Sequence, residues 1–160
     1  MSHPSLGLPP ADQRVIHPDA ARRVLEAAPR LAARALEVAI ERDPTFRERY
    51  DEAGLRARLR DAQLLAERLS VAIGIDDGAP MREYAEQVGP QYRRKQVPLW
   101  DLVQLCEGLR AALPAVLLPA ERAIADRGLD AAIPVLHKDG RLAGDARKKN
   151  AFVQFLYKGG

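Results

Sequence analysis

The sequence predicts an all-α domain, a bundle of six or more helices with an N-terminal arm and a C-terminal helix. Ala, Leu, Arg and Glu dominate the composition, and all four residue types favour helix. Aromatic residues make up only 5% and β-branched residues are sparse, which argues against a sheet protein. Apolar residues recur at spacings of three and four, whereas no heptad pattern persists, so amphipathic helices are expected and a coiled coil is excluded.

Length and composition indicate one globular domain. A chain of 160 residues can bury a real core, and 47% hydrophobic with 29% charged residues is typical of folded proteins. The single cysteine, Cys106, cannot form an intrachain disulfide, so a reducing, cytoplasmic setting is expected. The sequence contains no run of about 18 uncharged apolar residues, so no transmembrane helix is expected. The N-terminus lacks the features of a signal peptide.

The first two segments of the chain are an arm and a helix. Residues 1–18 carry four prolines and little periodicity, so an N-terminal arm is expected. The next apolar positions, from Val24 to Ala39, form one helical face. Pro29 lies inside this face and predicts a kink or a break near Ala28, with a short entry helix before a longer one.

Two more helices are expected before residue 96. Asp43 and Pro44 form a helix-start signal, and residues 55–73 then show an amphipathic stripe that Gly74 is expected to end. Residues 81–95 form a further helix. Its inward positions are Met81, Tyr84, Ala85 and Val88.

The second half of the chain starts with the longest expected helix. This helix runs from Pro98 to Leu117, and Pro114 and Pro119 must bend or divide it. Gly128 then separates a short helix at 129–136. A turn-rich linker and a last helix capped by Asp145 follow. The expected organisation is an arm at 1–18, a helical domain at 19–137, and a linker with a basic amphipathic helix at 138–160.

About half of the chain carries a resemblance to a known family. The stretches "RDPTFRERY", "LSVAIG" and "YRRKQVPLWDLVQLCEGLRAAL" follow one another between residues 42 and 113. Together they resemble a globin-type sensor domain, nearest the non-haem globin (RsbR-type N-terminal) domains of bacterial stressosomes. The resemblance implies a globin-like fold over 19–137, a bacterial and cytoplasmic protein, a homodimer, and a sensor in signal transduction that is not an enzyme.

The resemblance also draws attention to Tyr92. In haem globins the segment before such a "VP" junction resembles G-x-x-H-x-x-x-x-V, and here Tyr92 takes the place of the histidine that binds haem. Tyrosinate binds haem only with help to lose its proton. Arg93, Arg94 or Lys95 could lower the Tyr92 pKa if they turned toward it. The simpler interpretation is a half-buried tyrosine that packs in the core.

We expect a ligand cavity beside Tyr92, and we expect no catalytic site and no metal site. The candidate lining residues of the cavity are Leu69, Tyr84, Val88, Tyr92, Trp100 and Val103. The three histidines lack the spacing of zinc ligands, and Cys106 lies among leucines, where a thiol is usually inert. The paired carboxylates at 76–77 are typical of a solvated turn rather than of acid–base catalysis.

The C-terminal tail combines basic and aromatic residues. Such a pattern can bind nucleic acid or an anionic membrane, but it also fits a solvated helix face. The net charge of +3 is too modest for a dedicated nucleic-acid binder. The residues of the tail in question are Arg147, Lys148, Lys149, Phe152 and Phe155.

Three functional hypotheses follow from these patterns. The first is a non-enzymatic sensor or regulatory domain without a cofactor, which signals to a partner protein through a small apolar cavity or a dimer interface. The second is a haem- or tetrapyrrole-binding globin with a non-histidine ligand. The third is an adaptor that binds a protein or an anionic membrane through the tail.

Overall fold

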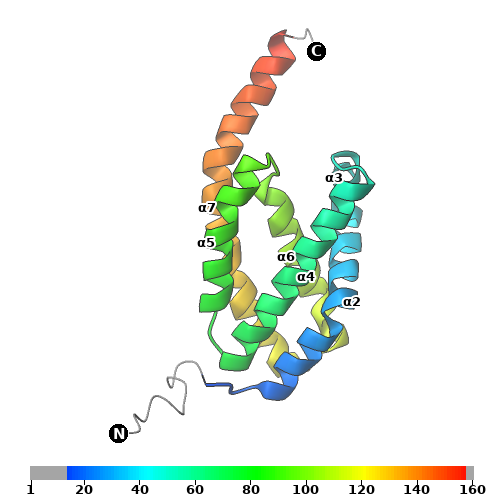
Figure 1. Cartoon of the computed structure of the whole chain (residues 1–160), viewed down its shortest axis with the longest axis vertical. Coiled ribbons are helices and arrows are strands. Elements are labelled where there is room, and N and C mark those ends of the chain that lie inside the picture. Colours follow the sequence, from blue (N-terminus) through cyan, green and yellow to red (C-terminus); the bar gives the residue numbers. More distant parts are fainter. Residues whose placement is uncertain (1–13, 158–160) are drawn as a thin grey trace, which may run out of the picture.

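The structure, a computed structural model, consists of helices and short connections in the part of the chain that it describes (Figure 1). It describes the backbone of residues 14–157 and the side chains of residues 14–138. This part contains six α-helices, one short 3-10 helix and no strand, so the predicted all-α fold is confirmed. The elements are α2 (Pro18–Arg42), α3 (Thr45–Glu48), α4 (Glu52–Ile75), α5 (Ala79–Arg94), α6 (Leu99–Ala112), η2 (Leu113–Ala115) and α7 (Pro119–Tyr157).

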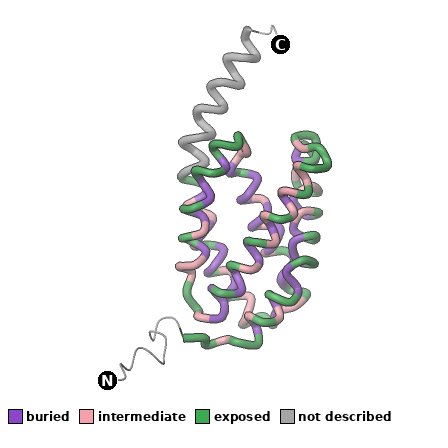
Figure 2. Tube along the Cα trace, viewed as in Figure 1, coloured by how far each residue is buried: buried purple, intermediate pink, exposed green. Residues whose placement is uncertain are grey.

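The helices surround one apolar core. The helix α2 packs on α4 and α6, and α7 packs on α5, α6 and α4. Buried residues line the facing sides of these helices, while the outer sides are exposed (Figure 2). The largest fully buried side chains are Val24, Phe46, Leu65, Leu69, Ile73, Met81, Leu102, Leu105, Leu109, Leu113, Leu129 and Leu136.

The first long helix is not divided at its proline. The helix α2 runs unbroken over 25 residues, so the prediction of two helices around Ala28 is wrong. Pro29 is exposed on the outer side, while Ala28 and Leu31 are buried against the neighbouring helices. Packing of the inner side therefore holds the helix together despite the backbone hydrogen bond that proline cannot make. His17 precedes Pro18 as the N-cap residue of α2.

The crossing of α2 and α6 is very close. An ideal Cβ atom at Gly108 of α6 would lie 2.3 Å from the carbonyl oxygen and 2.8 Å from the Cα atom of Ala35 on α2. Only glycine leaves room for a backbone at this distance. The helix α2 contributes small side chains on the same side, because its buried residues include five alanines from 27 to 39, namely Ala27, Ala28, Ala32, Ala35 and Ala39.

The start of α3 and the end of α4 both differ from the prediction, since α3 begins at Thr45 with Pro44 rather than Asp43 as its N-cap residue. The Asp43 carboxylate accepts a hydrogen bond from the Thr45 backbone N–H at 3.1 Å. The helix α4 extends to Ile75, one residue beyond Gly74, because Asp76 adopts the left-handed conformation that ends it (φ 51°). Gly74 is buried within the helix, and its carbonyl oxygen accepts hydrogen bonds from the backbone N–H groups of Ile16 and His17.

The order of helix lengths in the second half differs from the prediction. The helix α5 lies where expected, but α6 ends at Ala112, because Pro114 forces a short 3-10 turn. The longest helix is α7, with 39 residues. Gly128 does not break it; an ideal Cβ atom there would lie 2.8 Å from Leu69 Cδ1, so this glycine allows close packing on α4.

The backbone of α7 also runs through the expected linker. Residues 138–145 are helical, and no separate helix starts at Asp145, so both predictions are wrong. Figure 1 shows α7 leaving the bundle and continuing beyond its other helices. Within the described residues, no helix is both long enough and apolar enough to cross a membrane.

Candidate functional site

Five of the six predicted cavity residues lie in or against the core, and the sixth lies at the surface. Four of them, Leu69, Val88, Tyr92 and Val103, are buried in the packed core, and Tyr84 packs against it half-buried. Trp100 lies apart from them. It is 49% exposed, and its ring faces His137 of α7 at a centroid distance of 5.3 Å. The structure thus brings five of the six residues into or against the core and places the sixth at the surface beside α7.

Tyr92 is buried in surroundings that keep it neutral. Its side chain is 5% exposed, and its hydroxyl has no hydrogen-bond partner among the described residues. Burial, and next the charge of Asp61, raise the Tyr92 pKa. The nearby cation is Arg58, whose guanidinium lies 5.5 Å from the ring centroid, whereas Arg93, Arg94 and Lys95 are exposed. A raised pKa is the opposite of what a tyrosinate ligand needs.

Removing the Tyr92 hydroxyl should not destabilise the fold. A buried hydroxyl without a partner costs about 1–3 kcal/mol of desolvation, so Tyr92→Phe should leave the free energy of unfolding unchanged or raise it by about 1 kcal/mol. Urea unfolding followed by circular dichroism measures this. Tyr50→Phe is the matched control, because the Tyr50 hydroxyl donates a hydrogen bond to Asp101 and its loss should destabilise the fold. Destabilisation by Tyr92→Phe would reveal a partner for this hydroxyl.

An ion pair joins Arg49, the residue after α3, to the buried Asp101 of α6. Asp101 is 1% exposed and accepts two hydrogen bonds from Arg49, the shorter being 2.6 Å to Nη2. The Tyr50 hydroxyl donates to the same carboxylate, and burial and that contact raise the Tyr50 pKa to about 12. Arg58 stacks over the Tyr50 ring at 5.0 Å, so one set of polar contacts links α3, α4 and α6.

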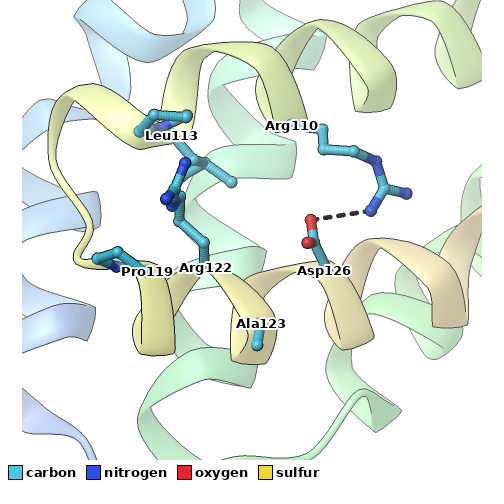
Figure 3. A pocket seen from close by; sticks show the side chains of 7 residues that line it. Arg110, Leu113, Pro119, Arg122, Ala123 and Asp126 are labelled. Atoms are coloured by element: carbon cyan, nitrogen blue, oxygen red, sulfur yellow. Dashed lines mark hydrogen bonds and ion pairs between the residues drawn. The ribbon is translucent and has the colours of Figure 1, made fainter.

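A surface pocket of about 360 Å³ lies between the end of α6 and the start of α7 (Figure 3). Charged side chains from both helices face it: Arg110 from α6, and Arg122 and Asp126 from α7. The remaining lining residues are Leu113, Pro114, Pro119 and Ala123. None of these seven residues belongs to the predicted cavity, so the site that the sequence predicted and the pocket that the fold forms are different places.

Ion pairs from three other parts of the fold hold the first turns of α7. We call them the α7 clamps. Arg23 of α2 forms a bidentate pair with Glu121, at 2.9 and 2.6 Å, and also donates to the Val116 carbonyl oxygen. Arg110 of α6 binds Asp126 at 2.8 Å and Asp130 at 2.6 Å. The third clamp joins Arg127 to Asp76 at 2.9 Å.

Asp76 is therefore more than a solvated turn residue. Its carboxylate lies 2.9 Å from Arg127 Nη2 and 3.6 Å from His17 Nε2. The hydrogen bond from Arg127 is the main cause of its lowered pKa. These pairs could not be predicted from the sequence, because Arg23 and Glu121 are 98 residues apart and Asp76 and Arg127 are 51 apart. A sequence pattern can predict pairs three or four residues apart on one helix. Pairs between distant helices depend on how the helices pack in the fold.

Because the clamps use carboxylates, we expect the free energy of unfolding to fall in acid. Hydrogen bonding to Arg23 lowers the Glu121 pKa from 4.5, so the folded state holds this proton less tightly than the unfolded state. The stabilisation is fully present above the unfolded pKa and is lost as the pH falls through the folded one. We expect Glu121→Gln to flatten the fall in stability below pH about 4.5, measured by urea unfolding at several pH values. Arg34→Gln, on the exposed side of α2, is the control; an unchanged slope in Glu121→Gln would contradict the prediction.

The remaining candidate groups are placed as follows. Cys106 is fully buried, and burial raises its pKa to about 12, which agrees with the predicted inert thiol. Among residues 14–138, no three His, Cys, Asp or Glu side chains gather to hold a metal ion. The side chains of the basic-aromatic tail, from Arg147 to Phe155, lie outside the described residues.

No protein-family model matches the chain, and no curated protein matches it.

Proposed function

We propose that this chain is a non-enzymatic regulatory domain of the sensor type, in which the bundle sets the position of α7 and α7 carries the change outward. One observation supports this most: α7 is held at its first turns by the clamps, yet it is a single helix to Tyr157 and continues beyond the bundle (Figure 1). A change in the clamps would therefore move the whole helix. The cytoplasmic, homodimeric, globin-like sensor that the sequence resembles is the form of this proposal that we favour.

The outer side of α4 supports the homodimer in this proposal. Leu64 and Val71 are seven residues apart on α4 and 46% and 50% exposed, and Leu25 on the adjacent α2 is 53% exposed. Side chains seven apart lie on the same side of a helix, so α4 can pair with α4 of a second copy. Sedimentation equilibrium should find a dimer that Leu64→Lys with Val71→Lys converts to a monomer. A monomeric unaltered chain would remove the dimer from the proposal.

The fluorescence emission of the single tryptophan, Trp100, can be used to measure a movement of α7. Trp100 faces His137, close to where α7 leaves the bundle, so its emission reports the distance between α6 and α7 at this point. Arg23→Gln and Arg110→Gln should change Trp100 emission and speed amide hydrogen exchange in residues 125–136. Arg34→Gln removes an arginine of the same kind from exposed pairs on α2 and should change neither. If both clamp variants behave like this control, α7 is a static part of the bundle and the proposal fails.

The haem-binding hypothesis receives no support from the surroundings of Tyr92. Its raised pKa and its packing in the core both favour the neutral side chain. We therefore expect a visible spectrum without a Soret band after haemin is added. A sharp band that Tyr92→Phe removes would instead make the chain a haem protein with tyrosinate as the ligand. His137→Ala is the control for ligation by the exposed histidine beside Trp100.

A further inference from the structure

One basic side chain of the pocket between α6 and α7 has no acidic partner. Arg122 is half-buried, and it forms no ion pair or side-chain hydrogen bond within the part of the chain whose side chains are described. The other guanidinium, Arg110, is engaged by Glu107, Asp126 and Asp130. A partly buried guanidinium without a partner favours an anionic group, most of all a carboxylate that it can bind through two N–H groups.

Within residues 14–138, only one carboxylate oxygen of Asp126, the acidic residue of the pocket, is hydrogen-bonded. Oδ1 of Asp126 accepts a hydrogen bond from Arg110 at 2.8 Å, while its other oxygen has no partner among the described residues. Arg122 and Asp126 are one helical turn apart, the spacing at which they could pair with each other, yet they do not. Figure 3 shows both rising from α7 toward α6, with Asp126 drawn to Arg110 and Arg122 beside Leu113. The pocket thus offers a cation at one end and an acceptor at the other.

The rest of the pocket is apolar and small. Leu113, Pro114, Pro119 and Ala123 form its walls. A volume of about 360 Å³ is near the lower end of the range for ligand sites. A ligand that fits must therefore be small, must carry an anionic group and a hydrogen-bond donor, and must have an apolar part between or beside them.

We propose that this pocket binds a free amino acid with an apolar side chain. Its carboxylate would accept hydrogen bonds from Arg122, its ammonium group would donate to Asp126, and its side chain would lie on Leu113 and the two prolines. A simple carboxylate would be repelled by Asp126, and a simple amine by Arg122. The zwitterion satisfies both charges at once.

Such a ligand acts directly on one of the α7 clamps. Asp126 holds α7 to α6 through Oδ1 and Arg110, and a ligand ammonium bound at its other oxygen would share the negative charge of the same carboxylate and so weaken the pair with Arg110. Binding would then loosen this clamp and shift α7. This consequence rests on the proposed function of α7, whereas the binding itself does not.

The test compares one amino acid with its two halves. Isothermal titration of the full chain uses L-leucine, 4-methylpentanoate, which lacks the amino group, and 3-methylbutylamine, which lacks the carboxylate. Each half loses a charge-assisted hydrogen bond, so it should bind at least about tenfold more weakly than leucine. No heat from leucine, valine or methionine at millimolar concentration would overturn the proposal. Equal binding of 4-methylpentanoate would overturn it too, because the site would then recognise a simple anion.

Variants connect any binding to the pocket. Arg122→Gln and Asp126→Asn should each weaken leucine binding at least about tenfold. Arg34→Gln removes the same charge from exposed pairs on α2, outside both the pocket and the clamps, and it should leave binding unchanged. Thermal unfolding shows that each variant is folded. Binding that survives Arg122→Gln would refute the assigned site, and leucine binding without a change in Trp100 emission would refute only the role of α7.

Discussion

Gly108→Ala is expected to destabilise the fold by about 3 kcal/mol or more. The added methyl group would meet the carbonyl oxygen of Ala35 at 2.3 Å and its Cα atom at 2.8 Å, which is backbone rather than a flexible side chain. The two helices must therefore move apart, and the contacts of α2 with α6 loosen along their length. Urea unfolding of the variant measures the loss.

Gly74→Ala is the matched control for this crossing. Gly74 is also a buried glycine inside a helix, but its nearest neighbour would be the Ala21 side chain at 3.3 Å. The gain in helix propensity, about 1 kcal/mol, offsets the small crowding, so Gly74→Ala should stay within about 1 kcal/mol of the unaltered chain. A Gly108→Ala protein as stable as this control would show that α2 and α6 do not approach as closely as the structure has them.

Arg49→Met is expected to cost about 3 kcal/mol of stability. Asp101 is 1% exposed, and without Arg49 its charge would keep only the hydrogen bond from Tyr50. Removing one partner of a buried pair is costly because the other charge remains uncompensated. Chemical unfolding at neutral pH measures the difference.

A second variant separates the charge from the packing. Arg49→Met with Asp101→Asn removes both charges and keeps an acceptor for Tyr50, so it should recover at least about 1 kcal/mol relative to Arg49→Met alone. Arg56→Met breaks an exposed pair with Glu52 and should change stability by less than about 0.5 kcal/mol. A double variant no more stable than Arg49→Met would mean that lost packing of the arginine, not the buried charge, causes the effect.

The sequence predicted the helices better than it predicted their ends. Periodicity located α4, α5 and the start of α6, because one side of each helix must be apolar to face the core. Pro29 and Gly128 predict breaks that α2 and α7 do not have. Pro29 lies on the exposed side of α2, and Gly128 fits against Leu69, so tertiary packing decides what each residue does.

The candidate site could be predicted only in part. Helix periodicity predicted that four of the candidate residues are buried, namely Leu69, Val88, Tyr92 and Val103. It could not predict whether they surround a cavity or fill the core, since both arrangements give the same spacing of apolar residues. The pocket between α6 and α7 depends on how Pro114 and Pro119 turn the chain back on itself. Trp100 is close to Tyr92 in sequence, and this closeness placed it among the expected cavity residues. Its side chain instead points from the start of α6 toward α7, a direction that the sequence does not reveal.

The continuity of α7 has a mechanical consequence. Leu136 is the last fully buried side chain among residues 14–138, and the helix runs on for about 20 residues, a rod of about 30 Å. Each residue of a helix turns by about 100°, so one residue inserted after Lys138 would rotate everything beyond it by that angle and lengthen the rod by only about 1.5 Å. Seven inserted residues would restore the angle nearly completely. An output that depends on the direction of the rod would fail with one extra residue and return with seven, whereas an output that needs only its reach would tolerate both.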